Sequence, residues 1–181
     1  MRVFLDACVL YPTILRGMLI DFAQTGAFIP LWSDGVVDEW QHAAKRNGHL
    51  DQAVIEKALF CNQWSKTRVT HMPISADIAL PDPNDIHVLE AALGGKADLL
   101  VTANLRDFPT KTLARLGLEV AHPDAFLAQC FRDDPIAGVE ILRTAHRAAT
   151  HRSGKDFTAE KLLKQMRLPR LRRALLNEEQ P

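Results

Sequence analysis

The chain has 181 residues, 47 % of them hydrophobic and 24 % charged, which is the balance of a globular protein and excludes disorder over most of its length. No apolar run approaches the ~20 residues needed to cross a bilayer, so we expect a cytoplasmic protein with no membrane partner. The net charge is zero, yet residues 131–181 carry 11 Lys and Arg against 7 Asp and Glu, while residues 1–130 carry 11 against 15.

Short apolar runs alternate with amphipathic segments over the first two thirds of the chain. The runs are too brief for helices and predict buried strands, in chain order at residues 3–5, 28–32, 99–101 and 118–121. Apolar residues at helical spacing predict helices between and after these strands, at residues 14–22, 36–40, 54–64, 86–93, 112–116 and from 123 onward. This alternation predicts an α/β fold with a mainly parallel central sheet and helices on both of its faces.

The C-terminal part shows helical patterns and no strand, so we expect a domain over residues 1–130 and a helical extension over residues 131–181. Two segments are predicted to lack regular structure, a connection over residues 72–80 and a frayed end over residues 178–181. Arginines of the extension either contact nucleic-acid phosphates or form the solvated face of packed helices, and both explanations stay open. They are Arg143, Arg147, Arg167, Arg170, Arg172 and Arg173.

The predicted topology brings oxygen-bearing side chains to one edge of the sheet, because the carboxyl ends of parallel strands share an edge. Asp6 ends the first strand, Glu39 lies about two turns into the helix after the second strand, and Asp85 opens the helix before the third. Further candidates lie near the same edge: Thr102, Asn104, Asp107 and Asp82. Taken alone, Asp82 and Asp85 could cap the helix that follows, Asp6 could be a turn residue, and Glu39 could lie on a solvated helix face. Only the joint arrangement indicates a site.

The crowding of acids at this edge points to a cation. Neighbouring carboxylates repel one another and raise each other's pKa unless a positive ion lies among them. Oxygen ligands without a His or Cys pairing favour Mg²⁺ or Mn²⁺ over zinc. The sequence therefore predicts a divalent-metal site. His87 lies one position from the apolar stripe of its helix, and we expect it to be a surface or packed histidine rather than a metal ligand.

Four segments match a known family in order and spacing. They are an N-terminal strand ending in Asp, a helical Glu about thirty residues later, D-P-N-D-I-H-V-L-E-A-A and V-T-A-N-L-R-D-F. Together they resemble PIN-domain ribonucleases, including the VapC-like toxins of type II toxin–antitoxin pairs and a subgroup with the motif T-x-N-L-x-D-F. The resemblance covers residues 1 to about 128 and implies a Rossmann-like PIN fold, dependence on Mg²⁺ or Mn²⁺, and hydrolysis of RNA phosphodiester bonds.

The resemblance assigns roles residue by residue. It implies catalytic positions at Asp6, Glu39, Asp85 and Asn104. The first three would be the metal ligands, and the secondary candidates are Thr102, Asp107 and Asp82. Many relatives carry Asp where this chain has Asn104, and an Asn supplies a carbonyl oxygen without charge. The site therefore holds one negative charge fewer unless Asp107 turns inward.

Two functions stay open at this level. The first is a metal-dependent endoribonuclease acting as the toxin of a pair, with RNA as substrate, a cognate antitoxin protein as partner, and a homodimer as one open oligomeric state. The second is a catalytically degenerate PIN module that binds RNA or protein without cleavage, which Asn104 keeps open. A phosphohydrolase on a similar sheet is disfavoured, because no second Asp follows two residues after Asp6.

Overall fold

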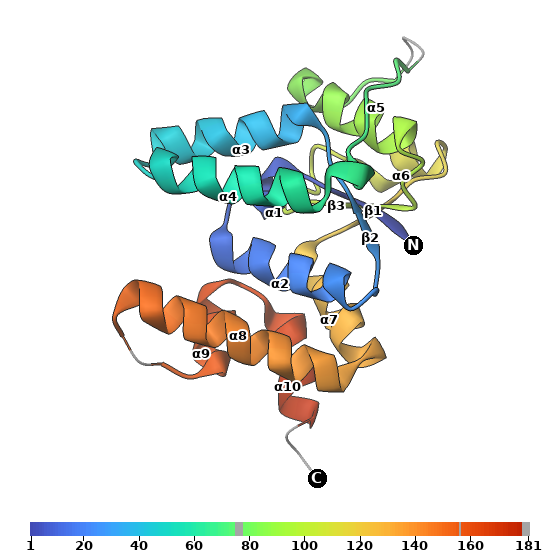
Figure 1. Ribbon diagram of the computed structural model, residues 1–181. Coiled ribbons are helices and arrows are strands. Elements are labelled where there is room, and N and C mark those ends of the chain that lie inside the picture. The colour runs from blue at the N-terminus through green and yellow to red at the C-terminus, as the bar shows by residue number, and fades with distance from the viewer. Residues whose placement is uncertain (75–77, 156, 179–181) are drawn as a thin grey trace. The chain divides into compact units, whose positions relative to one another are not determined.

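The computed structural model describes residues 1–74, 78–155 and 157–178. It confirms the predicted α/β class, with a parallel sheet and further helices toward the C-terminus (Figure 1). The protein divides into two compact units. Unit 1 comprises Met1–Pro12 and Phe28–Ala121, and unit 2 comprises Thr13–Ala27 and His122–Pro181.

Unit 1 holds a four-stranded parallel sheet. Its strands are β1 (Arg2–Leu5), β2 (Ile29–Leu31), β3 (Leu99–Val101) and β4 (Glu119–Ala121), in the spatial order β2-β1-β3-β4. Phe4 lies in register with Leu31 on one side and with Leu100 on the other, and all three residues are fully buried. Because β1 and β3 are neighbours, the residues just beyond their carboxyl ends meet at one edge of the sheet.

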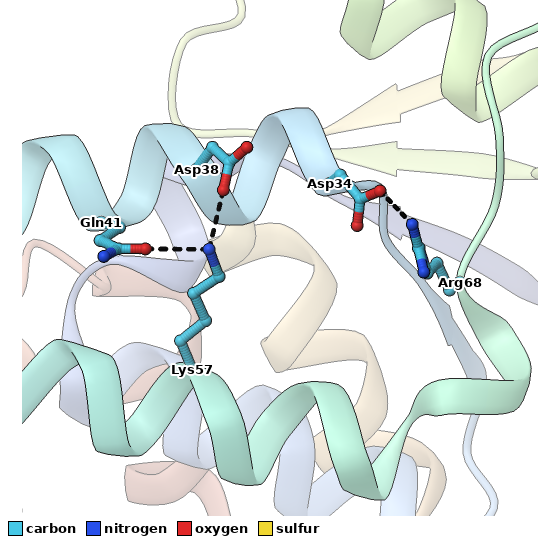
Figure 2. A network of polar contacts seen from close by, with 5 residues as sticks. All are labelled: Asp34, Asp38, Gln41, Lys57 and Arg68. Atoms are coloured by element: carbon cyan, nitrogen blue, oxygen red, sulfur yellow. Dashed lines mark hydrogen bonds and ion pairs between the residues drawn. The ribbon is translucent and has the colours of Figure 1, made fainter.

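The other elements of unit 1 are helical: α1 (Ala7–Leu10), α3 (Asp34–Arg46), α4 (Leu50–Gln63), η1 (Ser65–Thr67), η2 (Pro83–Asp85), α5 (Ile86–Gly94) and α6 (Thr110–Ala114). Helices α3 and α4 lie side by side, and Figure 2 shows the polar contacts around them. Lys57 of α4 donates to Asp38 at 2.7 Å and to Gln41 at 2.9 Å, and Arg68 beyond η1 pairs with Asp34. These contacts lie near the surface, so each adds little stability, but together they favour one orientation of α3.

Unit 2 consists of helices: α2 (Thr13–Gln24), α7 (Pro123–Asp133), α8 (Pro135–Ser153), α9 (Ala159–Gln165) and α10 (Pro169–Glu178). Helix α8 packs on α2, and α10 packs on α7 and α9. The helix starts are well marked, since Asp134 accepts from Ala137 N at the start of α8 and Thr158 accepts from Lys161 N at the start of α9. No strand occurs beyond residue 130 in the part of the chain that the structure describes, as predicted.

Three local features differ from expectation or lie beyond what is described. Helix α1 directly after β1 was not predicted, because four residues are too few to show a helical period. Ser33 precedes α3 at the N-cap position, where serine commonly caps a helix, but its hydroxyl makes no capping bond. The predicted connection and frayed end include residues 75–77 and 179–181, outside the described residues, and the boundary at residue 130 stays a prediction. None of the described helices is long and apolar enough to cross a membrane.

Candidate active site

Asp6 lies immediately after β1, where the strand gives way to α1. It is only 7 % exposed, and its side chain makes no capping bond to α1. Instead, its Oδ2 accepts a hydrogen bond from the Thr102 hydroxyl at 2.6 Å. Thr102 follows β3, the strand next to β1, and it is fully buried. The two adjacent strand ends thus bring these side chains together, as the sequence predicted.

Cys8 provides a second contact to the same carboxylate oxygen. Its Sγ lies 3.1 Å from Asp6 Oδ2, and it accepts from Ala103 N at 3.2 Å. Burial and then the Asp6 charge raise the pKa of the Cys8 thiol to about 12. The thiol therefore keeps its proton near neutral pH and serves as a donor to Asp6, a role that sequence analysis missed.

Asp85 lies at the start of α5, but its side chain makes no capping bond there. Its Oδ2 is buried and has no hydrogen-bond partner among the described residues. Burial raises the pKa of Asp85 to about 6, and the charges of Asp6, Asp82, Asp107 and Glu39 contribute in that order. Acids from other chain segments, among them the predicted Asp6 and Glu39, therefore lie close enough to Asp85 to act on its carboxyl.

Asp82 behaves differently from Asp85, although both stand in the same loop. Its Oδ1 accepts from Asn84 N at 2.9 Å, so Asp82 caps the short helix η2. Pro83 follows at the first helical position, where its missing N–H costs nothing. Asp82 is thus a local structural residue whose charge still acts on Asp85.

Glu39 reaches the site from α3 and is held by a histidine. Its Oε1 lies 2.7 Å from His87 Nε2, and the Glu39 side chain is 44 % exposed. This hydrogen bond is the main reason why the pKa of His87 is raised above its ordinary value. Sequence analysis assigned His87 no role beyond packing, because its partner lies 48 positions away on another helix.

Asn104 and Asp107 pair with each other rather than reaching Asp6. The Asn104 side-chain amide donates to Asp107 Oδ2, and its backbone N–H donates to the Thr102 hydroxyl at 3.0 Å. The loop after β3 is therefore tied to the buried Thr102. Asp107 still contributes its charge to the surroundings of Asp85, which is the compensation that Asn104 in place of Asp would require.

A comparison with protein families matches the PIN domain over residues 2–106. This chain belongs to the PIN-domain family. The match covers more than half of the chain and includes every residue placed in the site so far except Asp107. A comparison with curated proteins and a comparison with solved structures found no match. PIN domains are generally nucleases, so the fold of unit 1 is of a nuclease type.

PIN domains generally use divalent metal ions, and the donor chemistry of this site fits such an ion. The unpartnered buried oxygen of Asp85, crowded by other acids, is a position that a cation would relieve. However, no three His, Cys, Asp or Glu residues within the described ranges lie in a ready metal-binding group. Mg²⁺ does not require such a cage, because it commonly binds one or two carboxylates and completes its shell with water and substrate phosphate.

Proposed function

We propose that this PIN-domain protein is a Mg²⁺- or Mn²⁺-dependent endoribonuclease. The observation that supports this proposal most strongly is the buried Oδ2 of Asp85, which has no hydrogen-bond partner among the described residues and is near acids from separate elements. A nuclease must neutralise a scissile phosphate and activate water, and both tasks call for a cation held by carboxylates. Placing like charges close together has no benefit to folding, so their convergence is better explained by a ligand.

Different residues of the site would have different roles in the reaction. Asp6 and Asp85 would hold the ion, which supplies charge neutralisation at the phosphate and a more acidic water. The Thr102 hydroxyl and the Cys8 thiol fix the orientation of the Asp6 carboxylate through their hydrogen bonds. Glu39, fixed by His87 but still open to solvent, is placed to orient the attacking water or to contribute a metal ligand.

The variant Asp6→Asn tests this proposal with a single-stranded RNA substrate. We expect cleavage to fall by more than about 100-fold, since even the outer partners of metal ligands are worth roughly 10- to 100-fold. The matched control is Asp38→Asn, which removes an exposed carboxylate of α3 whose ion-pair partner is Lys57 of α4. Cleavage should also vanish when EDTA removes the metal and return when Mg²⁺ is restored.

Two outcomes would contradict the endoribonuclease. Asp6→Asn protein that cuts as fast as wild type would remove Asp6 from the mechanism. Cleavage that persists in EDTA would remove the metal. Folding of the variant is checked by its circular dichroism, so that a loss of activity is not confused with unfolding.

We also propose that the protein acts as the toxin of a type II pair that a cognate antitoxin protein neutralises. The support is the resemblance of its motifs to VapC-like toxins, which the family match does not resolve. Expression of the wild type in bacteria should arrest growth, and expression of Asp6→Asn should not. Equal growth with both forms would count against the toxin role while leaving RNA cleavage to be decided by the cleavage assay.

A catalytically degenerate PIN module is the second candidate, and one observation favours it. The Asn104 side-chain amide donates to Asp107, so these two side chains pair with each other rather than with Asp6. Such a module would bind RNA with a dissociation constant that EDTA does not change, and it would release no product. The cleavage assay with Mg²⁺ therefore separates the two candidates directly.

A further inference from the structure

The side chain of His87 packs against α3, between Gly35 and Glu39. One edge of its ring faces Glu39, where Nε2 lies 2.7 Å from Oε1. The Nδ1–Cε1 edge of the ring faces Gly35, because a Cβ added there would lie 2.7 Å from His87 Nδ1 and 3.1 Å from Cε1. Gly35 and Glu39 are four residues apart on one helix, so they lie on the same face one turn apart. The ring of His87 thus fills the space that the missing side chain leaves.

The direction of the hydrogen bond follows from the chemistry of the two groups. An ionised carboxylate only accepts, so His87 Nε2 is the donor to Glu39. His87 Nδ1 is buried and has no hydrogen-bond partner among the described residues, so no competing bond pulls the ring away. The ring of His71 stands edge-on to that of His87, with 6.1 Å between the two ring centroids.

Glu39 needs such a support because it is much more exposed to solvent than Asp6. Its side chain is 44 % exposed, whereas Asp6 is 7 % exposed and is held by Thr102. A long carboxylate side chain loses rotamer entropy when it is fixed in one orientation. A partner that fixes it before substrate arrives removes much of that cost from the reaction.

We infer that His87 is a positioning residue that orients Glu39 for the reaction, and that Gly35 is required because any side chain there would displace the ring. The inference rests on the proposed nuclease function. His87 acts through Glu39 and is not placed on the substrate. Its contribution therefore depends on the presence of the Glu39 carboxylate.

Three substitutions test this inference by kinetics. His87→Leu removes the donor, and we expect kcat for RNA cleavage to fall about 10- to 100-fold with little change in KM, as for other partners of metal ligands. His87→Gln keeps an N–H donor the same number of bonds from Cα and should recover much of the loss. Gly35→Ala should lower kcat like His87→Leu, because it moves the ring without changing either chemical group.

Gly17→Ala is the matched control for Gly35→Ala. Gly17 lies in α2, and an added Cβ there would meet nothing within 4 Å. Both substitutions improve helix propensity, so neither should weaken its helix. Only the one at Gly35 is expected to lower kcat, and equal kcat values for the two variants would overturn the role assigned to Gly35 and to the ring position.

A double-mutant cycle separates positioning from a structural role. In protein that already carries Glu39→Gln, His87→Leu should have little further effect on kcat, since the group it positions is gone. If His87→Leu costs the same factor with and without the Glu39 carboxylate, the positioning role is wrong. A general loss of folding would lower activity in both backgrounds and would show in thermal unfolding.

Imidazole ¹H–¹⁵N spectra of the metal-free protein give a readout that needs no activity. The His87 Nε2–H signal should be present in the wild type and in Gly17→Ala, and should shift in Gly35→Ala and Glu39→Gln. Wild-type protein that shows this pairing but cuts no RNA would refute the proposed function and, with it, the role of His87 in catalysis. Wild-type protein that cuts RNA without the pairing would refute the positioning role alone.

Discussion

At the scale of single residues, the Asp85 carboxyl is the least favourably placed group of the site. One of its oxygens, Oδ2, is buried and has no hydrogen-bond donor among the described residues, and other acids lie nearby. Thr102 and Cys8 supply donors to Asp6, but Asp85 Oδ2 has no equivalent within the described chain. Such crowding in a metal-free protein is expected where a cation normally offsets it.

We predict that Asp85→Asn stabilises the metal-free protein at pH 7 while it abolishes RNA cleavage. The pKa of Asp85 is about 6 in the folded protein, against an ordinary value of 3.8 for an aspartate, so the folded state binds more protons between these limits. Stability contributed by this group therefore falls as the pH rises from about 4 to about 6 and stays low above that range. The stability gain of the variant should grow over the same window.

Thermal unfolding in EDTA between pH 4 and pH 8 measures this difference. Asp38→Asn is again the control, because Asp38 pairs with Lys57 and its loss should give no such gain. An Asp85→Asn protein that is less stable than wild type at pH 7 and above would mean that this carboxylate is a structural partner rather than a crowded one.

The sequence predicted which acids would gather but not what holds them. Asp6 follows a strand, Asp85 opens a helix, and Glu39 lies in a helix that begins at a strand end. The order of these elements in a parallel sheet is constrained, so the convergence of the three acids follows from topology. The contact of His87 with Glu39 joins distant segments, which no local pattern reports, and the hydrogen bond from Cys8 to Asp6 depends on how the buried thiol packs. The one signal in the sequence was their spacing, since each stands two residues after a predicted metal ligand, on the helical turn that the ligand begins.

At the scale of elements, α10 of unit 2 is held at its start by a residue from another helix. Asp124 of α7 is 5 % exposed, and its carboxylate accepts from Arg170 N and Leu171 N at 3.0 Å. Leu168, the residue before α10, has no side-chain oxygen for this purpose. Asp124 therefore acts as the N-cap of α10 from a position 46 residues before Arg170 in the chain.

We predict that Asp124→Ala destabilises the protein by about 1 to 3 kcal/mol, because it leaves the first N–H groups of α10 without a charged acceptor. The control is Asp134→Ala, which removes an exposed cap that accepts from Ala137 N at the start of α8, and should cost about 1 kcal/mol or less. Urea unfolding measures the change in the free energy of unfolding for each variant. Hydrogen exchange should locate the loss at the Arg170 and Leu171 amides, and unchanged protection there would contradict the capping role.

Elements with a clear hydrophobic pattern were easier to predict than elements without one. The buried runs of β1 and β3 and the helical stripe of α5 all occur where the sequence predicted them, because burial dictates their periodicity. Helix α1 spans four residues and was missed. The capping of α10 by Asp124 was also missed, since a cap supplied from another helix has no local sequence signal.

At the scale of the whole molecule, the basic C-terminal part is not uniform. Arg143 pairs with Glu140 and Arg172 pairs with Glu160, so these arginines are already engaged. In contrast, Arg170 and Arg173 line a groove of about 490 Å³ between α7 and α10, together with Arg132 and one acid, Glu178. Guanidinium groups suit phosphate because they present paired donors to its oxygens. If the basic residues of unit 2 contact RNA, this groove is the part equipped for it.

We predict that the double variant Arg170→Gln with Arg173→Gln weakens RNA binding and flattens its dependence on salt. Each lost phosphate contact on a single strand changes the slope of log K against log salt by roughly 0.7, so two contacts give a change of about 1.4. The control is Arg143→Gln with Arg172→Gln, which removes the same charge from the same unit but from existing ion pairs. Binding is measured with the Asp6→Asn protein, so that no RNA is cut. Equal slopes for the two double variants would favour the alternative, in which all these arginines form the solvated face of packed helices.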